Sequence, residues 1–250
     1  MYIIGDIGNT EVKICLINKN FKIKKRINLK TSEISYSKIK TKLAPFIKKK
    51  LIIDNVVFSS VVPYVYKHFV FFFKSRFKKK IIEIKKLTLN SLIDIRVNKK
   101  QVGSDRLANS IAAIDMKNNF IIIDFGTATT FDVVMKNRYL GGIISPGINL
   151  SLSTLSARAS LIPEINLKKI SYVVGKNTNE AVRSGFYWGY AGLIDNMVKL
   201  IKRQTKSDFK IILTGGLADL YKKSINANCK VDKDLTIKGI IKITKSNLKK

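Results

Sequence analysis

The sequence contains an internal repeat in which a short apolar run ends in Asp-x-Gly and then resumes as a strand. The first copy occupies residues 2–18, with Asp6 and Gly8 at its turn, and the second occupies residues 119–134, with Asp124 and Gly126. After each turn, apolar residues alternate with polar ones, as they do in a half-covered strand. Because a repeat constrains architecture more than any single element does, it predicts two similar halves. Each half should open with a β-hairpin whose tip carries aspartate and glycine.

The rest of the chain alternates predicted helices and strands, which is typical of an α/β protein. The further strands are expected at residues 21–29, 55–62, 81–84, 139–144 and 211–213. The helices are expected at residues 36–50, 64–77, 150–160 and 178–202. The predicted domain boundary divides the chain into residues 1–112 and residues 113–250.

The first hairpin tip carries groups suited to phosphate. Gly8 lets the backbone approach a ligand closely, and the turn amides with the Asn9 and Thr10 side chains offer donors to phosphate oxygens. Asp6 would repel a phosphate unless a cation lay between them, so we interpret it as a ligand of a phosphate-bound cation. An ordinary hairpin turn is the alternative, because Asp, Gly and Asn are common in turns.

The second tip, Asp124-Phe125-Gly126-Thr127, strengthens the phosphate interpretation because it repeats the same chemistry. Two such tips facing each other across a cleft would hold the polyphosphate of a nucleotide from both sides. A glycine pair, Gly215-Gly216, follows a predicted buried strand and would let the backbone lie flat beneath an adenine ring or a ribose. An isolated Gly-Gly pair indicates only a turn.

Between the halves, Gly103-Ser104-Asp105-Arg106 precedes a predicted helix at residues 110–116. One interpretation is a surface ion pair between Asp105 and Arg106 at a helix start, which would stabilise little. In the functional interpretation, the carboxylate accepts a hydroxyl proton and the guanidinium holds a substrate carboxylate.

The two Asp-x-Gly hairpins and the Thr-Gly-Gly at residues 214–216 resemble the phosphate and adenosine motifs of the actin, Hsp70 and sugar-kinase superfamily. This resemblance implies a duplicated ribonuclease H-like fold, with a nucleotide cleft between two similar halves. Gly-x-Asp-Arg at residues 103–106, Gly-Gly-x-Ile-x-Pro-Gly at 141–147 and Thr-x-Glu-Ala at 178–181 are similar to the type III pantothenate kinases. That resemblance implies ATP-dependent phosphorylation of pantothenate, the first step of coenzyme A biosynthesis.

The resemblance also implies a role for each matching residue. Asp105 is the expected general base, Asp124 the expected site of a monovalent cation (K⁺ or NH₄⁺), and Asp6 the expected Mg²⁺ ligand, directly or through water. The expected pantothenate contacts are Gly103, Ser104, Asp105, Arg106 and Thr178. The expected ATP contacts are Asp6, Ile7, Gly8, Asn9, Thr10, Glu11, Val12, Lys13, Thr127, Gly215 and Gly216. Because family members are dimers with the substrate site at the subunit interface, we expect a homodimer in which Thr178 serves the neighbouring site.

One position departs from the family pattern. The family usually has tyrosine in a Tyr-x-Asn pattern ahead of Gly-x-Asp-Arg, whereas this chain has Arg96-Val97-Asn98. Loss of the aromatic ring would loosen the pantothenate pocket unless the flat guanidinium of Arg96 covers it. We therefore expect a change in affinity more than in activity.

The formal net charge of +30, from 47 basic and 17 acidic residues, would attract anionic partners of many kinds. The lysines are spread over the whole chain instead of clustering on one stripe, which disfavours nucleic acid as a partner. A nucleic-acid-binding or transcription accessory protein without kinase activity is the alternative function. A phosphatase of the same superfamily is a third.

The sequence also bears on location. Its two cysteines, Cys15 and Cys229, imply neither a disulfide framework nor a metal cluster and fit a reducing cytosol. No uninterrupted apolar segment approaches the roughly 18 residues that span a bilayer, and the first residues lack the basic region of a signal peptide. We expect a cytoplasmic protein with no membrane partner.

Overall fold

The computed structural model describes residues 1–47 and 51–248. The chain forms two compact units, of which the first contains Met1–Ala113 together with the segment that begins at Asp234. The second unit is Ile114–Lys233. The predicted halves, residues 1–112 and 113–250, differ from these units in the closing segment, because its helix packs against the first unit.

The first unit is built on a five-stranded sheet with the order β3-β2-β1-β4-β5. Its strands are β1 (Tyr2–Ile7), β2 (Glu11–Ile17), β3 (Ile23–Lys30), β4 (Asn55–Ser60) and β5 (Ile81–Glu83). β1, β2 and β3 pair antiparallel, whereas β4 and β5 continue the sheet in parallel. In the first half of β2, Val12 and Ile14 are buried while Glu11 and Lys13 are partly exposed, which is the alternation that predicted this strand.

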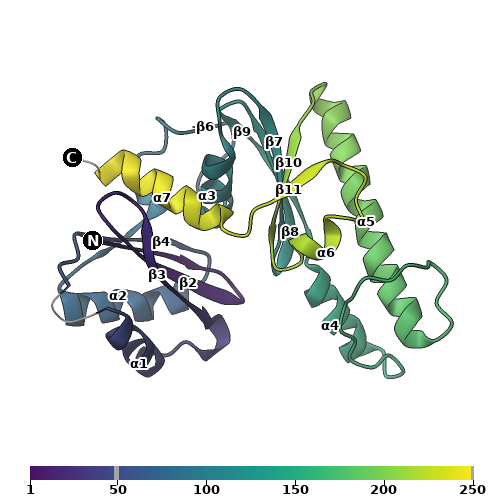
Figure 1. Ribbon diagram of the computed structural model, residues 1–250, viewed down its shortest axis with the longest axis horizontal. Helices are drawn as coiled ribbons and strands as arrows, with labels where there is room; N and C mark the ends of the chain where they lie inside the picture. Colours follow the sequence, from purple (N-terminus) through teal and green to yellow (C-terminus); the bar gives the residue numbers. More distant parts are fainter. Residues whose placement is uncertain (48–50, 249–250) are drawn as a thin grey trace. The chain divides into compact units, whose positions relative to one another are not determined.

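Helices cover both faces of this sheet (Figure 1). α1 (Tyr36–Phe46) and α2 (Pro63–Phe77) lie on one face, and α3 (Ser104–Ala113) and α7 (Leu235–Leu248) lie on the other. Two 3₁₀ turns, η1 (Thr31–Glu33) and η2 (Ile84–Lys86), belong to the connections, and β6 (Asp94–Ile95) is a short edge strand. The helix predicted at residues 36–50 ends at Phe46, and residues 48–50 lie outside the described part of the chain.

The second unit repeats the strand arrangement of the first. Its strands are β7 (Asn119–Phe125), β8 (Ala128–Met135), β9 (Arg138–Pro146), β10 (Lys210–Gly215) and β11 (Cys229–Val231), in the order β9-β8-β7-β10-β11. Again the first three strands pair antiparallel and the last two continue in parallel. The predicted duplication is therefore confirmed at the level of topology, with Asp6 and Asp124 in corresponding strands.

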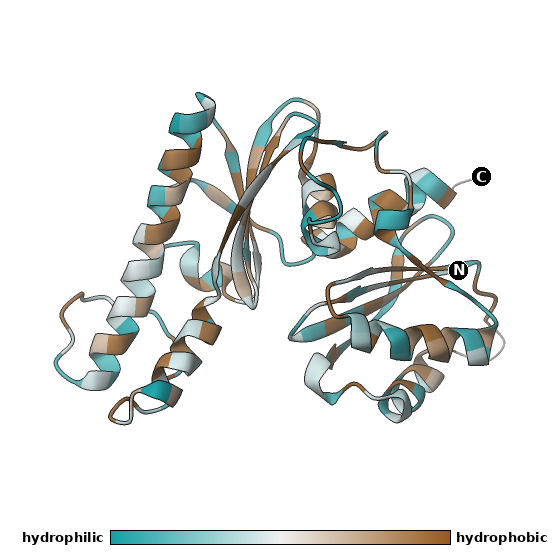
Figure 2. Cartoon of the chain, turned by 180° about the vertical axis from the view of Figure 1, so that it is seen from behind, coloured by the Kyte–Doolittle hydropathy of each residue, from teal (hydrophilic) through white to brown (hydrophobic). Residues whose placement is uncertain are grey.

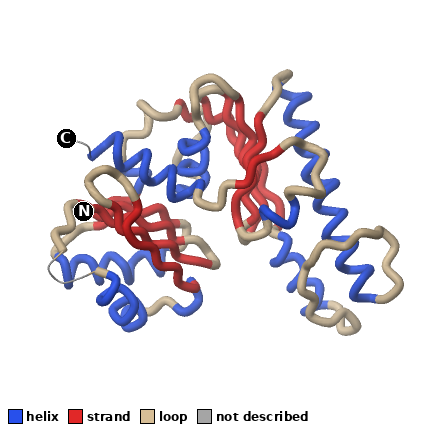
Figure 3. The backbone as a smooth tube through the Cα atoms, in the orientation of Figure 1, coloured by secondary structure: helices blue, strands red, loops and turns tan. Residues whose placement is uncertain are grey.

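α4 (Ile148–Arg158), α5 (Thr178–Thr205) and α6 (Ala218–Tyr221) complete the second unit (Figure 3). α5 begins where the sequence predicts, because the side chain of Asn177 accepts a hydrogen bond from the Glu180 amide and caps the helix. Apolar and polar residues alternate along α5 (Figure 2), and its buried residues include Ile194, Val198 and Ile201. No helix of the described residues is both long and apolar enough to cross a membrane.

α3 differs from its prediction. The sequence predicted a helix at residues 110–116, but α3 begins at Ser104 and ends at Ala113. Asp105 lies in its first turn, where a carboxylate interacts favourably with the helix dipole. Beyond the helix, the Asp115 side chain accepts hydrogen bonds from the amides of Lys117 and Asn118, and this turn prevents the helix from continuing.

Candidate active site

The first hairpin tip is a closed turn at the end of β1. The amide of Gly8 donates to the carbonyl of Glu11 at 3.0 Å, and the hydroxyl of Thr31 donates to the carbonyl of Gly8 at 2.8 Å. Asn9 and Thr10 are exposed at the tip, where their side chains can reach a ligand. The predicted ATP-binding residues 6–13 are therefore brought together on one hairpin.

Asp6 belongs to β1, which lies between β2 and β4 in the sheet. Its register partners are Lys13 on β2 and Ser59 on β4. Lys13 is also within 3.8 Å of the Glu11 carboxylate, so its ammonium group lies on the hairpin. The Asp6 carboxylate and the Lys13 ammonium group therefore belong to neighbouring strands of the same hairpin.

The second hairpin tip brings together its own set of predicted residues. The amide of Gly126 donates to the carbonyl of Ala128 at 3.1 Å, and the amide of Gly147 donates to the carbonyl of Thr127 at 3.1 Å. Asp124 pairs in register with Thr130 on one side and with Thr214 on the other. The tip is therefore held by β8, β10 and the turn that leads into α4.

Gly215 is required at its position next to this tip. Its φ is +87°, which L side chains rarely adopt, and a Cβ there would lie 2.6 Å from Asp124 Oδ1. The amide of Gly216 donates to the carbonyl of Phe125 at 3.1 Å. The predicted adenosine motif and the predicted cation ligand are thus in direct contact within the second unit.

Asp105 lies in the first unit, at the start of α3. Its Oδ1 accepts a hydrogen bond from the amide of Arg106 at 2.8 Å. Burial raises the pKa of the Asp105 carboxyl group, while the amide and charge of Arg106 oppose this shift. The structure therefore places a carboxylate of increased basicity directly after Gly103 and Ser104.

The hydroxyl group of Ser104 holds the start of α3 against β4. Ser104 is buried, and its hydroxyl donates to the carbonyl of Ser60 at 3.0 Å and accepts from the amide of Ser60 at 2.9 Å. The Ser59 hydroxyl donates to the same oxygen at 3.2 Å. Because Ser59 is the β4 register partner of Asp6, these contacts connect the base of α3 to the first hairpin.

Arg96 and Asn98 lie where the sequence departs from the Tyr-x-Asn pattern, and each makes a local contact. The guanidinium of Arg96 forms an ion pair with Asp94 at 2.6 Å. The side chain of Asn98 accepts a hydrogen bond from the amide of Lys100 at 3.1 Å, which orders the start of the loop before Gly103. Thr178 belongs to the second unit, where it is the exposed first residue of α5.

Sequence reasoning missed two side chains near the α3 motif. The Lys85 ammonium group binds the loop that precedes Gly103, and the Asn109 side chain is buried in α3. Lys85 lies in a lysine-rich stretch and contacts backbone carbonyls. Because every residue has such a carbonyl, the sequence contains no pattern that marks this contact. Asn109 could have been noticed as a polar residue on the apolar face of a helix.

The described residues contain no group of three or more His, Cys, Asp or Glu side chains that could hold a metal ion. Mg²⁺ that is bound by one or two carboxylates together with phosphate oxygens and water needs no such group. Asp6 suits that arrangement because it lies beside the turn amides. Asp124 occupies the corresponding position before the turn of the second hairpin.

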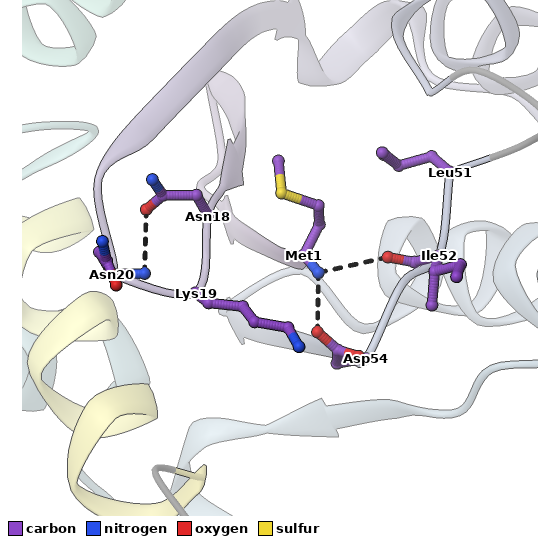
Figure 4. A pocket seen from close by; sticks show the side chains of 7 residues that line it. All are labelled: Met1, Asn18, Lys19, Asn20, Leu51, Ile52 and Asp54. Atoms are coloured by element: carbon purple, nitrogen blue, oxygen red, sulfur yellow. Dashed lines mark hydrogen bonds and ion pairs between the residues drawn. The ribbon is translucent and has the colours of Figure 1, made fainter.

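A pocket of about 550 Å³ lies at the other end of β1, around the N-terminus of the chain (Figure 4). The Met1 amino group donates to the carbonyl of Ile52 at 3.2 Å and to the Asp54 carboxylate at 2.7 Å. Asp6 and Gly8 belong to the opposite end of the strand. The pocket is therefore separate from the candidate active site.

Three comparisons relate the chain to known proteins. A family model described as type III pantothenate kinase matches residues 2–200. A type III pantothenate kinase from Pelagibacter ubique is 55% identical over 98% of this chain and 98% of its own length.

The third comparison concerns solved structures. A Sinorhizobium meliloti protein provisionally described as a 2-dehydro-3-deoxygalactonokinase matches 98% of this chain and 99% of its own, with a TM-score of 0.59 and 12% identity. A Campylobacter jejuni protein provisionally described as a Baf family transcriptional activator matches 98% of both chains, with a TM-score of 0.57 and 20% identity. At these identities the likeness establishes the fold alone.

Proposed function

Because the chain belongs to the type III pantothenate kinase family, we propose that it transfers the γ-phosphoryl group of ATP to the primary hydroxyl of pantothenate, the first step of coenzyme A biosynthesis. The observation that carries this proposal is the 55% identity to a named pantothenate kinase over 98% of both chains. The positions of Asp6 and Asp105 in the first unit are consistent with it.

The first hairpin is proposed to bind the ATP phosphates. Its turn amides and the side chains of Asn9, Thr10 and Lys13 would donate to phosphate oxygens. Asp6 would hold Mg²⁺, directly or through water, so that the ion neutralises charge on the β- and γ-phosphates. Phosphoryl transfer asks little covalent work of a protein, so positioning and charge neutralisation of this kind supply most of the rate increase.

Asp105 is proposed as the general base. The pantothenate hydroxyl oxygen forms a bond to the γ-phosphorus, the bond from that phosphorus to the bridging oxygen breaks, and ADP leaves with the electron pair. The hydroxyl proton passes to the Asp105 carboxylate. The raised pKa supports this role, because a more basic carboxylate is a better acceptor for a proton that is lost late in the transition state. Gly103, Ser104 and Arg106 would shape the pantothenate site, with Arg106 available to bind its carboxylate.

The second hairpin is proposed to bind a monovalent cation and the nucleoside. K⁺ prefers oxygen ligands, and Asp124 supplies carboxylate oxygen at the tip. Thr127 would contact ATP, and Gly215 with Gly216 would allow the nucleoside to lie against the backbone. The contact between Gly215 and Asp124 supports a single site for both ligands.

A homodimer is proposed to complete the substrate site. Val173 and Val174 are 67% and 84% exposed and precede Thr178 by a few residues, and Leu161 is 89% exposed. Exposed apolar side chains near one another in a segment are typical of an interaction surface. Burying them against a second copy would carry Thr178 to the partner's pantothenate site. The proposed place of action is the cytoplasm, where ATP is supplied.

Incubation with ATP, Mg²⁺ and K⁺, with and without pantothenate, tests the function. A kinase forms ADP and phosphopantothenate only when pantothenate is present. ADP formation that is independent of pantothenate would indicate a phosphatase, and no ADP under either condition would contradict both enzymes. Replacing K⁺ by Na⁺ tests the proposed monovalent cation in the same assay.

A further inference from the structure

Lys85 holds the loop that leads into the proposed base. It lies in the η2 turn, directly after β5, and its Nζ donates to the carbonyl of Lys100 at 3.0 Å and to the carbonyl of Val102 at 2.9 Å. Val102 is followed by Gly103, and Asp105 lies two residues further on. One ammonium group therefore fixes two backbone positions within five residues of the proposed base.

The same loop is held at its beginning by a different residue. The side chain of Asn98 accepts from the amide of Lys100 at 3.1 Å, and its carbonyl accepts from the amide of Gln101 at 3.0 Å. These bonds form a local turn and leave the placement of Val102 to longer-range contacts. Lys85 supplies such a contact, and it reaches the loop from another part of the chain.

Lys85 is itself held in place by Glu83. The Glu83 carboxylate accepts a hydrogen bond from the backbone amide of Lys85 at 2.8 Å, which caps the η2 turn. Burial raises the pKa of Glu83, while the amide and charge of Lys85 oppose this shift. The turn therefore presents the lysine side chain from a fixed backbone.

Lys85 also acts on Asp105 through its charge. Burial raises the pKa of Asp105, and the positive charges of Arg106 and Lys85 oppose this effect. Glu83 of β5 also lies at this end of α3, because its carboxyl group interacts with the side chain of Ser104. β4 supplies the hydroxyls of Ser59 and Ser60, and Lys242 of α7 donates to the carbonyl of Ile111 near the far end of the helix.

We propose that Lys85 is a positioning residue for phosphoryl transfer, because its ammonium group fixes the loop of residues 100–102 and so holds the adjoining Asp105 carboxylate in place. This inference rests on the proposed kinase function. A lysine fits the role because one compact ammonium group can donate to two carbonyls and carry the charge at the same time.

The experiment compares Lys85→Met, Lys85→Gln and Lys85→Arg with the wild type in the full-length chain. Lys86→Met is the matched control, since Lys86 is the exposed neighbour. The readouts are kcat and KM for pantothenate, the pH profile of kcat, and amide hydrogen exchange of residues 98–107. Thermal melting measures the folded fraction of each variant.

We expect Lys85→Met and Lys85→Gln to lower kcat about 10- to 100-fold, the range for a displaced catalytic group. The acid limb of the kcat profile should move to higher pH, because loss of the positive charge raises the pKa of Asp105, and exchange of residues 98–107 should increase. Lys85→Arg should keep the acid limb close to that of the wild type, and Lys86→Met should stay within about twofold of wild-type kcat.

The proposal is overturned if both neutral variants keep the wild-type acid limb and the wild-type exchange rates, whatever their kcat. It is equally overturned if their loss of kcat equals their loss of folded protein. If neither neutral variant folds, Lys85→Arg decides: a wild-type acid limb supports the role, and a shifted limb contradicts it. If the wild type shows no pantothenate-dependent turnover, the proposed function fails. In that case, unchanged hydrogen exchange in the neutral variants would still reject the contact between Lys85 and the loop.

Discussion

Thr236 of α7 donates a hydrogen bond to the side-chain oxygen of Asn109 in α3 at 2.8 Å, and both residues are buried. Asn109 lies one helical turn after Asp105, so the closing helix of the chain fixes the helix that carries the proposed base. We expect Thr236→Val to lower the free energy of unfolding by about 1–3 kcal/mol, because it removes a buried donor. Urea unfolding measures the change. Thr236→Ser keeps the hydroxyl and should lose less, and unchanged stability in Thr236→Val would contradict a stabilising role of this hydrogen bond.

Gly239 allows α7 to lie against α3. A Cβ at this position would collide with the backbone of Ala108. We expect Gly239→Ala to destabilise the protein by about 1–3 kcal/mol, since the two helices would have to separate. Gly192 in α5 is the control, because a Cβ there meets no atom within 4 Å and Gly192→Ala should stabilise by up to about 1 kcal/mol. Equal melting temperatures for the wild type and Gly239→Ala would contradict the close helix contact.

Asp105→Asn tests the proposed base directly. The amide oxygen of asparagine can still accept from the Arg106 amide, so the fold should persist while the proton acceptor is lost. We expect kcat to fall by about 10²- to 10⁴-fold, the usual contribution of a general base. Asp208→Asn, at a carboxylate that is 98% exposed, should leave kcat unchanged. Wild-type turnover in Asp105→Asn would reject the assignment of the base.

The first hairpin illustrates what the sequence could predict. Alternation of apolar and polar residues in β2 and the Asp-x-Gly turn after β1 are local signals, and their recurrence at Asp124 predicted the duplicated topology. The start of α5 was equally local, because Asn177 and Glu180 lie within one turn of each other. These predictions needed no knowledge of long-range packing.

The closing helix illustrates what the sequence could not predict. Residues 235–248 join the first unit through contacts with α3 that span more than 120 positions, including Thr236 with Asn109 and Lys242 with Ile111. The start of α3 at Ser104 depends in the same way on its contacts with Ser59 and Ser60 of β4. Lys85 binds backbone carbonyls, which every residue possesses, so no residue pattern could indicate its partner.

An ion pair joins Arg26 of β3 to Asp234, the residue directly before α7. It predicts how the stability of the protein depends on pH. The guanidinium donates to the carboxylate at 2.7 Å, and this hydrogen bond lowers the pKa of Asp234 despite partial burial. Because the pKa of Asp234 is lower in the folded state than its ordinary value of about 3.9, the ion pair stabilises the fold at pH values above about 3.9. This stability is lost as the pH falls through the lowered pKa. Both side chains are a third or more exposed, so we expect Arg26→Gln to cost only about 0.2–1 kcal/mol at pH 7.

Urea unfolding of Arg26→Gln and the wild type at several pH values checks this expectation. The difference between them should shrink below about pH 4, as Asp234 becomes protonated in both. Lys25→Gln, at the exposed preceding residue, controls for the loss of one positive charge. A difference that stays constant down to pH 3 would show that Arg26 acts through packing and not through the carboxylate.

The net charge of +30 predicts that salt stabilises this protein. Like charges distributed over one chain repel one another, and the folded state brings them closer together than the unfolded state does. The Debye length falls from about 10 Å at 0.1 M salt to about 3 Å at 1 M, so added salt screens this repulsion. We expect the melting temperature to rise with ionic strength and to rise equally in KCl, NaCl and choline chloride, since screening does not depend on the identity of the cation. A flat response would show that the lysines are too well separated to repel, and a rise confined to K⁺ would indicate a bound ion instead.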